Sequence, residues 1–231
     1  MQKKILIIGN NDGLQGVKVD IENYKGFFKS HIGGEWYDSE IITKLNPSRT
    51  EIVDEITRMK SLSLDYSIII FSGHGGQKRE TILELNSIGE KLYESELKDI
   101  SKRQLTIFDC CRCYPEPLVE SARGVTALLN KAFTDVGTRL RYETRIMQAI
   151  PQQANLYACS IGEEAKDSSA GGIYSKHLIQ SAKRLQSTFK LVGTTHIEAA
   201  ELTTIENPKQ HPDSLLSKCL SEQQLIISLR P

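Results

Sequence analysis

Four short apolar runs, each followed by small or polar residues, constrain the fold of this chain more than any other feature. They cover residues 5–8, 67–71, 105–108 and 156–158. Because the runs are unbroken rather than alternating, they are typical of strands buried on both faces of a parallel sheet. Between them, apolar residues recur at helical spacing in 17–28, 52–59 and 178–185. This alternation predicts an α/β domain with crossover connections.

Smaller elements fill in around this frame. Residues 40–45 predict another strand, and residues 46–48 a turn into a capped helix. Residues 81–93 predict a small β-hairpin in which Gly89 takes a positive φ. Residues 190–192 and 225–229 are further strand candidates, whereas the polar segment 118–153 fits either a helix pair or a loop. With 231 residues, the chain is long enough for one domain with a substantial core.

Charge and cysteine usage exclude several classes of protein. Lys+Arg and Asp+Glu both number 29, so no net field draws the chain to nucleic acid or to a membrane, and we expect neither as a partner. The first apolar run is too short for a signal peptide and no stretch could span a bilayer, which favours a cytoplasmic protein. The five cysteines fit a reducing compartment and lack zinc-site spacing, so we expect no metal and no cofactor.

Two of the predicted strands end in residues that carry chemistry. Residues 67–71 run into Ser72-Gly73-His74-Gly75-Gly76, and residues 105–108 run into Asp109-Cys110-Cys111-Arg112. Loops at the carboxyl ends of parallel strands project over a shared crevice. We therefore expect His74 and a cysteine to lie close together.

An imidazole beside a thiol is the basis of nucleophilic acyl transfer. The thiol must lose its proton to attack a carbonyl carbon, and histidine accepts that proton near neutral pH. Backbone N–H groups nearby can bind the developing oxyanion. Taken singly, a histidine between glycines is more often a loop residue and a strand-end cysteine more often a buried apolar residue. The two together favour peptide or amide hydrolysis.

These residues resemble the caspase and metacaspase superfamily. The resemblance rests on residues 71–75 and 108–111, and extends over nearly the whole chain through 14–28 and 157–174. It implies a mostly parallel six-stranded sheet sandwiched between helices, with a large-subunit-like part (1–117), a linker (118–153) and a small-subunit-like part (154–231). It also implies that His74 is the general acid/base and Cys111 the nucleophile, with Cys110 its apolar neighbour. The N–H groups of Gly75 and Cys111 would form the oxyanion hole, and no metal takes part in the chemical step.

The resemblance also predicts substrate specificity. Specificity depends on the pocket that binds P1, the substrate residue immediately before the cleaved bond. Caspases that cut after aspartate use arginines there, but residues 10–16 contain none. Asp20 and Asp109 stand where metacaspases use acids, with Ser72 beside them, so we expect cleavage after Arg or Lys. Two structural roles stay open: Asp20 as a helix N-cap before Ile21, and Asp109 as a residue orienting its turn.

Three departures from the metacaspase pattern lead to further expectations. Arg112-Cys113-Tyr114 replaces the usual His-Ser-Gly. Between His74 and Cys111, the acidic cluster that many metacaspases show is reduced to Glu80, Glu84 and Glu90. These are too few and too scattered for a calcium site, which predicts calcium independence. No regulatory domain is apparent, so control by a partner protein is expected, as in the bacterial caspase-like effectors of defence or regulated cell death that the chain resembles.

The polar segment 118–153 is a candidate for autocleavage, since it is rich in the basic residues that the enzyme itself would prefer: Arg123, Lys131, Arg139, Arg141 and Arg145. Basic surface helices are equally common. The expected partner of the site is a protein or peptide substrate. Alternatives are a catalytically silent caspase-like scaffold, a caspase-like protease with a non-basic P1 preference, and a redox thiol protein using Cys110, Cys111 and Cys113. Adjacent cysteines form strained disulfides and no C-x-x-C motif is present, which disfavours the last.

Overall fold

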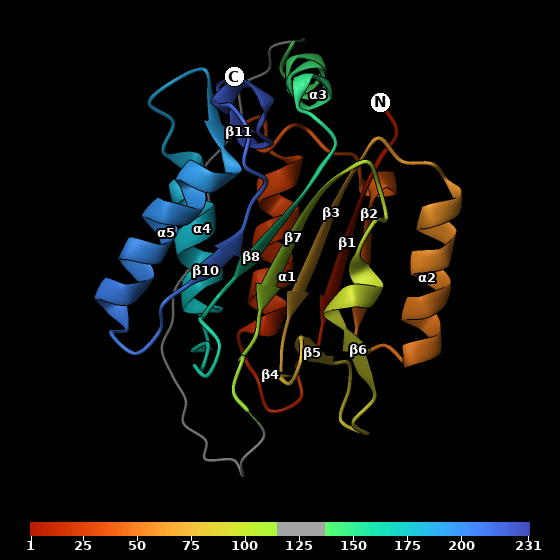
Figure 1. Cartoon of the computed structure of the whole chain (residues 1–231), viewed down its shortest axis with the longest axis vertical. Coiled ribbons are helices and arrows are strands. Elements are labelled where there is room, and N and C mark those ends of the chain that lie inside the picture. Colours follow the sequence, from red (N-terminus) through yellow and green to blue (C-terminus); the bar gives the residue numbers. More distant parts are fainter. Residues whose placement is uncertain (115–136) are drawn as a thin grey trace.

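A computed structural model describes residues 1–114 and 137–231, and its centre is a six-stranded sheet in the order β10-β8-β7-β3-β1-β2 (Figure 1). Five of the strands are parallel to one another: β1 (Lys3–Gly9), β2 (Ile41–Leu45), β3 (Tyr66–Ser72), β7 (Arg103–Asp109) and β8 (Gln152–Tyr157). β10 (Asp213–Leu215) pairs antiparallel with β8 at one edge. The predicted fold class, a mostly parallel six-stranded sheet between helices, is confirmed.

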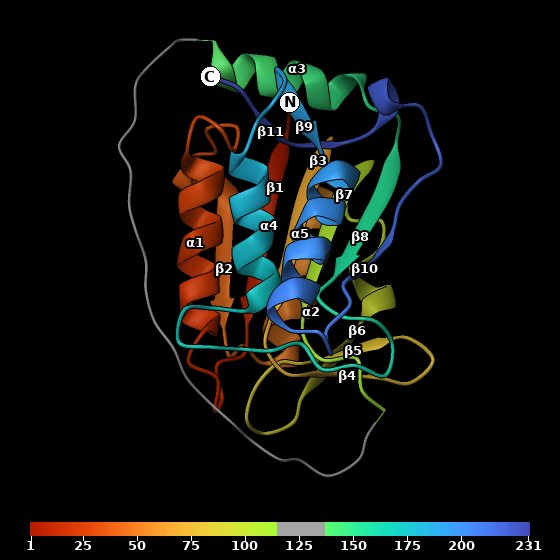
Figure 2. The same ribbon diagram turned by 90° about the vertical axis from the view of Figure 1, so that its left-hand side faces the viewer.

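Helices cover both faces of the sheet. α1 (Val17–Lys29), α4 (Ile173–Lys183) and α5 (Val192–Glu206) lie on one face, and α2 (Arg49–Ser61) lies on the other (Figures 1 and 2). In β1, Ile5 and Ile7 join the core under α1 and α4, while Leu6 and Ile8 join the core under α2. The apolar runs are unbroken because every residue of such a strand faces one of these two cores.

α3 (Thr138–Gln148) lies across the amino-terminal end of the sheet (Figure 2). Lys3 Nζ at the start of β1 lies 3.2 Å from a Glu143 carboxylate oxygen, and Arg139 pairs with Glu40 at 2.6 Å. Of the segment left open as a helix pair or a loop, residues 138–148 are thus one packed helix. Residues 118–136 lie outside the described residues.

Two small sheets flank the central one. The predicted hairpin is confirmed as β5 (Thr81–Glu84) and β6 (Lys91–Tyr93), with Gly89 at φ 80°, and β4 (Gly75–Gln77) extends it to three strands. The predicted end strands are β9 (Phe189–Leu191) and β11 (Ile226–Leu229), which pair with each other in a separate sheet. Val192 was wrongly included in the first of them, because it begins α5.

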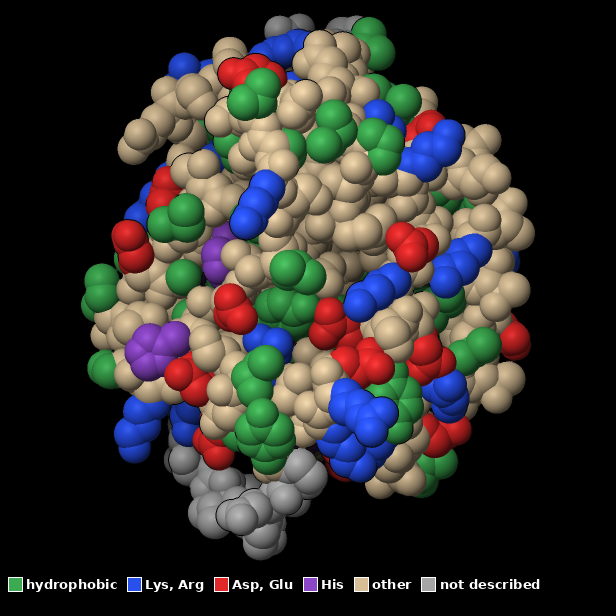
Figure 3. All heavy atoms as spheres, in the orientation of Figure 1, with side chains coloured by type: hydrophobic (Ala, Val, Ile, Leu, Met, Phe, Trp, Pro, Cys, Tyr) green, Lys and Arg blue, Asp and Glu red, His purple; other side chains and the backbone are tan. Residues whose placement is uncertain are grey.

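The remaining local features are turns and short helical segments. Ser48 caps α2, as predicted, because its hydroxyl accepts a hydrogen bond from the Glu51 N–H at 3.3 Å. Single 3₁₀ turns occur at Asp38–Glu40, Glu94–Leu97 and Ser221–Gln223. Acidic and basic side chains are interspersed over the face shown in Figure 3. Among the described helices, none is both long enough and apolar enough to cross a bilayer.

Candidate active site

The two chemistry-bearing strand ends are neighbours in the sheet. β3 pairs with β7 so that Ser72 lies opposite Asp109, and the Gly73 N–H donates to the Asp109 carbonyl at 3.1 Å. His74 follows β3 by two residues, and Cys111 follows β7 by two residues. The parallel register therefore brings both side chains to the same edge of the sheet.

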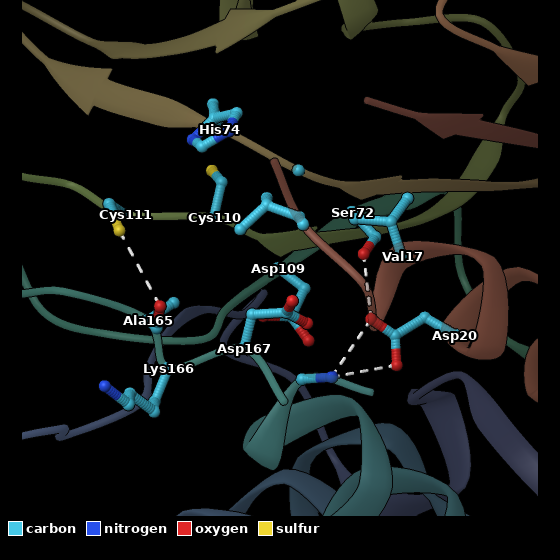
Figure 4. A pocket seen from close by; sticks show the side chains of 13 residues that line it. Val17, Asp20, Ser72, His74, Asp109, Cys110, Cys111, Ala165, Lys166 and Asp167 are labelled. Carbon is cyan, nitrogen blue, oxygen red and sulfur yellow. Dashed lines mark hydrogen bonds between the residues drawn. The ribbon is translucent and has the colours of Figure 1, made fainter. Parts of the chain in front are cut away.

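A pocket of about 50 Å³ lies at this edge, with room for a few water-sized groups. Its walls come from β3, β7, the beginning of α1 and the loop between β8 and α4 (Figure 4). All five side chains predicted for the site line it: Asp20, Ser72, His74, Asp109 and Cys111. Leu14, Val17, Gly73, Cys110, Ala165, Lys166, Asp167 and Gly172 complete the lining.

The orientation of His74 is set by the loop after β1. Its Nε2 lies 2.6 Å from the backbone carbonyl oxygen of Asp12. Because a carbonyl can only accept a hydrogen bond, Nε2 carries the proton in this contact. Nδ1 of the neutral ring is then the nitrogen able to accept a proton, as a general base must.

The Cys111 thiol faces the loop between β8 and α4. Its Sγ donates to the Ala165 carbonyl at 3.7 Å (Figure 4), and burial raises the thiol pKa to about 11. A thiol with this pKa is almost fully protonated at neutral pH and is a poor nucleophile. Attack therefore requires that Cys111 leave Ala165 and meet a base.

Cys110 differs from its neighbour in accessibility. It is 2% exposed and belongs to the core under α2, whereas Cys111 is half-buried at the pocket. A Cβ on Gly75 would lie 2.7 Å from Cys110 Sγ, so this close approach requires glycine. Burial, reinforced by the neighbouring Cys159 and Cys111, raises the Cys110 pKa well above its usual range. Cys110 has the surroundings of a packing residue.

Asp20 and Asp109 are 2% and 6% exposed. Asp20 accepts hydrogen bonds from the Ser72 hydroxyl at 2.8 Å and from the Gly172 N–H at 3.0 Å. Asp109 Oδ2 accepts from the Ser175 N–H at 3.2 Å and from the Ser175 hydroxyl. Both carboxylates thereby receive donors from the first turn of α4, where the helix dipole favours negative charge.

Both carboxyl pKa values are nonetheless raised. Burial raises the pKa of Asp109 to about 6, and burial together with the Asp109 charge raises that of Asp20 well above its usual range. The reading of Asp20 as a helix N-cap is wrong, because α1 begins at Val17 and its N-cap position is Gly16. Asp20 points instead to Ser72 and Gly172.

Asp167 was missed in the sequence. It lies in the loop between β8 and α4, lines the same pocket, and accepts a hydrogen bond from the Gly16 N–H at 3.1 Å. Burial raises its pKa. No local pattern distinguishes it from other loop aspartates, since its position depends on the long-range packing of that loop against α1.

The residues after Cys111 are fixed by the same loop. The Arg112 N–H donates to the Glu163 carbonyl at 3.0 Å, and its buried guanidinium lies 4.0 Å from the centre of the Tyr157 ring. Where the usual motif has His-Ser-Gly, this chain has Arg112-Cys113-Tyr114, and Arg112 connects the segment after Cys111 to β8 and the loop that follows it. Both the backbone N–H and the guanidinium of Arg112 make these contacts.

The scattered acids between the two strand ends have separate partners. Glu80 accepts from the Ser95 N–H at 2.6 Å, Glu84 pairs with Lys91 at 3.4 Å, and Glu90 accepts from the Asn86 side-chain amide at 2.7 Å. Within residues 1–114 and 137–231, no group of three or more His, Cys, Asp and Glu side chains is arranged to hold a metal ion. Calcium independence stays a prediction.

Comparison with known proteins identifies the family and the fold. The profile of the caspase domain family, peptidase family C14, matches residues 2–213. Caspase-1 from Spodoptera frugiperda superposes with a TM-score of 0.64 at 11% identity, over 99% of this chain and 90% of its own. Protein GSU0716 from Geobacter sulfurreducens superposes with a TM-score of 0.62 at 14% identity, over 100% and 98%. At these identities the structures share the fold alone. Among curated proteins, none matches the sequence.

Proposed function

Because the chain belongs to the caspase domain family, we propose that it is a cysteine endopeptidase whose catalytic pair is His74 and Cys111. The observation that carries this proposal is the convergence of both residues on one pocket from the ends of adjacent parallel strands. The Asp12 carbonyl supports it, since its contact with Nε2 leaves Nδ1 as the basic nitrogen. The half-buried Cys111 thiol suits the nucleophile better than the fully packed Cys110.

The reaction follows from these groups. When substrate enters, the Cys111 thiol leaves the Ala165 carbonyl and gives its proton to Nδ1 of His74. The sulfur attacks the peptide carbonyl carbon, and the N–H groups of Gly75 and Cys111 donate to the resulting oxyanion. The C–N bond then breaks as His74 protonates the leaving amine. Water, deprotonated by His74, hydrolyses the thioester and restores the thiol.

We infer further that P1 is basic. Within the described residues, no ion pair engages Asp20 or Asp109, although both carboxyls are buried against the pocket. A buried carboxylate without a cation costs free energy, and an arriving guanidinium or ammonium offsets that cost. Ser72, already a donor to Asp20, adds a hydroxyl oxygen that can accept from the same cation.

A panel of fluorogenic peptides that differ only at P1 tests this proposal. We expect turnover of Arg and Lys peptides by the wild-type protein and none by Cys111→Ala or His74→Ala. Efficient cleavage after aspartate without cleavage after Arg or Lys would refute the basic preference. A silent scaffold would cleave nothing and would leave Cys111 unlabelled by an arginyl chloromethyl ketone, which an active dyad attacks.

The basic residues of the segment 118–153 are the candidate sites of autocleavage. Arg139, Arg141 and Arg145 lie in α3, where Arg139 pairs with Glu40 and the guanidinium groups of the other two donate to backbone carbonyls. Arg123 and Lys131 lie outside the described residues. We propose that any autocleavage occurs after Arg123 or Lys131, because a protease needs an extended substrate chain and α3 is folded. Control by a partner protein, and a role in defence or regulated cell death, rest on family resemblance alone.

A further inference from the structure

Asn10, the first residue after β1, belongs to a closed ring of hydrogen bonds that includes His74. Its side-chain Nδ2 donates to the Glu84 carbonyl at 2.9 Å, and the Glu84 N–H donates to the His74 carbonyl at 3.0 Å. Nε2 of His74 donates to the Asp12 carbonyl at 2.6 Å, and the Asp12 N–H donates to Asn10 Oδ1 at 3.1 Å. The ring thus returns to the Asn10 amide after holding both the backbone and the imidazole of His74.

The surroundings of Asn10 fix its amide in place. Asn10 is 1% exposed, and its backbone N–H donates to the Ser72 carbonyl at 3.0 Å. A Cβ on Gly73 would lie 2.9 Å from the Asn10 Cβ, so the close approach of the two segments requires glycine. The two ends of the amide have opposite partners, a carbonyl oxygen for Nδ2 and an N–H for Oδ1. An amide supplies both a donor and an acceptor, whereas an ionised carboxylate has no donor.

We propose that Asn10 is a positioning residue of the peptidase, which acts through the Asp12 carbonyl to hold the His74 imidazole in place. This rests on the proposed function. Proton transfer between Cys111 and Nδ1 depends on the direction of the imidazole, and a displacement of about 1 Å in a reacting group can cost on the order of a hundredfold in rate. An exposed carbonyl keeps that direction only if its own loop is held. Asp12 is exposed, and the buried Asn10 amide ties its N–H to β5 through Glu84.

The alternative is that Asn10 only shapes the loop after β1, since an asparagine that accepts from the N–H two residues further on makes a common turn. A residue of that kind affects stability, but the folded protein turns over substrate as before. Two substitutions separate the roles. Asn10→Ser keeps an oxygen that can accept from the Asp12 N–H but is too short to reach Glu84, so it opens the ring at one point. Asn10→Ala opens the ring at two points.

Asn11→Ser is the matched control for these variants. Asn11 is the next residue of the same loop, and its side-chain oxygen accepts from the Asn46 side-chain amide at 2.7 Å instead of taking part in the ring.

The experiment measures kcat and KM for a fluorogenic Arg peptide, corrected for the folded fraction of each variant. For Asn10→Ser we expect kcat to fall about tenfold, and for Asn10→Ala further, because the imidazole is less well placed for proton transfer. KM should stay within about twofold of the wild-type value, since the ring holds the base rather than the substrate. Asn11→Ser should keep kcat within about twofold. An unchanged kcat in folded Asn10→Ser, or a loss that Asn11→Ser shares, would overturn the positioning role.

If the wild-type protein cleaves no peptide, the proposed function fails separately, and NMR of Cys111→Ala still tests Asn10. The order parameter of the His74 ring, assigned by the loss of its signal in His74→Gln, reports how firmly the imidazole is held. Measured well below the Tm of each variant, it should be lower in Cys111→Ala/Asn10→Ser than in Cys111→Ala and unchanged in Cys111→Ala/Asn11→Ser. Equal values in all three would refute the proposal.

Discussion

Replacing Asp109 by asparagine should stabilise the fold at neutral pH while it removes activity on basic substrates. The carboxyl is buried, and its pKa rises from an ordinary value of 3.8 to about 6 on folding. At about 1.4 kcal/mol per pH unit, this difference corresponds to about 3 kcal/mol of destabilisation when the group is ionised. Asparagine removes the charge and keeps an oxygen that can accept from Ser175.

The sign of the pH dependence follows from the direction of the shift. Below pH 3.8 the carboxyl is protonated in both folded and unfolded chains, and the penalty is absent. As pH rises towards 6 the unfolded chain releases the proton first, so the wild-type protein loses stability, and above pH 6 the full penalty applies. The gain from Asp109→Asn should therefore be about 3 kcal/mol at pH 7.5 and about 1 kcal/mol at pH 4.5.

Urea denaturation at the two pH values measures this gain as a shift in midpoint at constant m-value. Asp54→Asn is the control, because Asp54 lies on the exposed side of α2 and its replacement should change the free energy of unfolding by less than about 0.5 kcal/mol. An equal gain at both pH values would assign it to packing rather than to charge. No gain at pH 7.5 would refute the electrostatic reasoning.

Three other outcomes are expected. Mass spectrometry should find cuts after Arg123 or Lys131 in the wild-type protein and none in Cys111→Ala; the same cuts in both would mean another protease. Peptide turnover should be the same in a chelator and with added calcium, and a clear rate increase with calcium would contradict this. The alkylation rate of Cys111 in the free protein should be low at pH 7 and should rise about tenfold per pH unit towards pH 11, because burial raises the pKa of the thiol to about 11. Rapid labelling of the Cys111 peptide at pH 7 would instead show that the thiol is already deprotonated.

The central sheet could be predicted because its signal is local. Each core strand is an apolar run, and the burial of both faces follows directly from that composition. α5 was missed because it lacks an apolar stripe: its buried positions include Thr195, His196, Ala199 and Thr203, while Ile197 and Ile205 are exposed. β10 is three residues long and mostly exposed, so its pairing with β8 depends on the sheet edge rather than on its own sequence.

The site, too, has features that could be predicted from the sequence and features that could not. A histidine and a cysteine could be expected to meet because each lies just after a predicted strand, and the order of the parallel strands brings the two strand ends together. The choice of Cys111 over Cys110 came from the family resemblance. The orientation of the thiol towards Ala165 could not be predicted, and neither could the contribution of Asp167. Both depend on how the loop between β8 and α4 folds back over the strand ends, which no pattern within that loop encodes.

Hydrogen bonding alone does not explain why the pocket contains acids. An asparagine at position 20 or 109 could accept from Gly172 or Ser175 with its side-chain oxygen, and it would avoid the cost of burying a charge. The carboxylates therefore lower the stability of the empty protein for no gain in its own contacts. Such a cost is typical of residues whose partner is absent from the free protein. A cation in the pocket would offset this cost. For this reason, the gain in stability of Asp109→Asn and its loss of turnover on basic substrates should appear together.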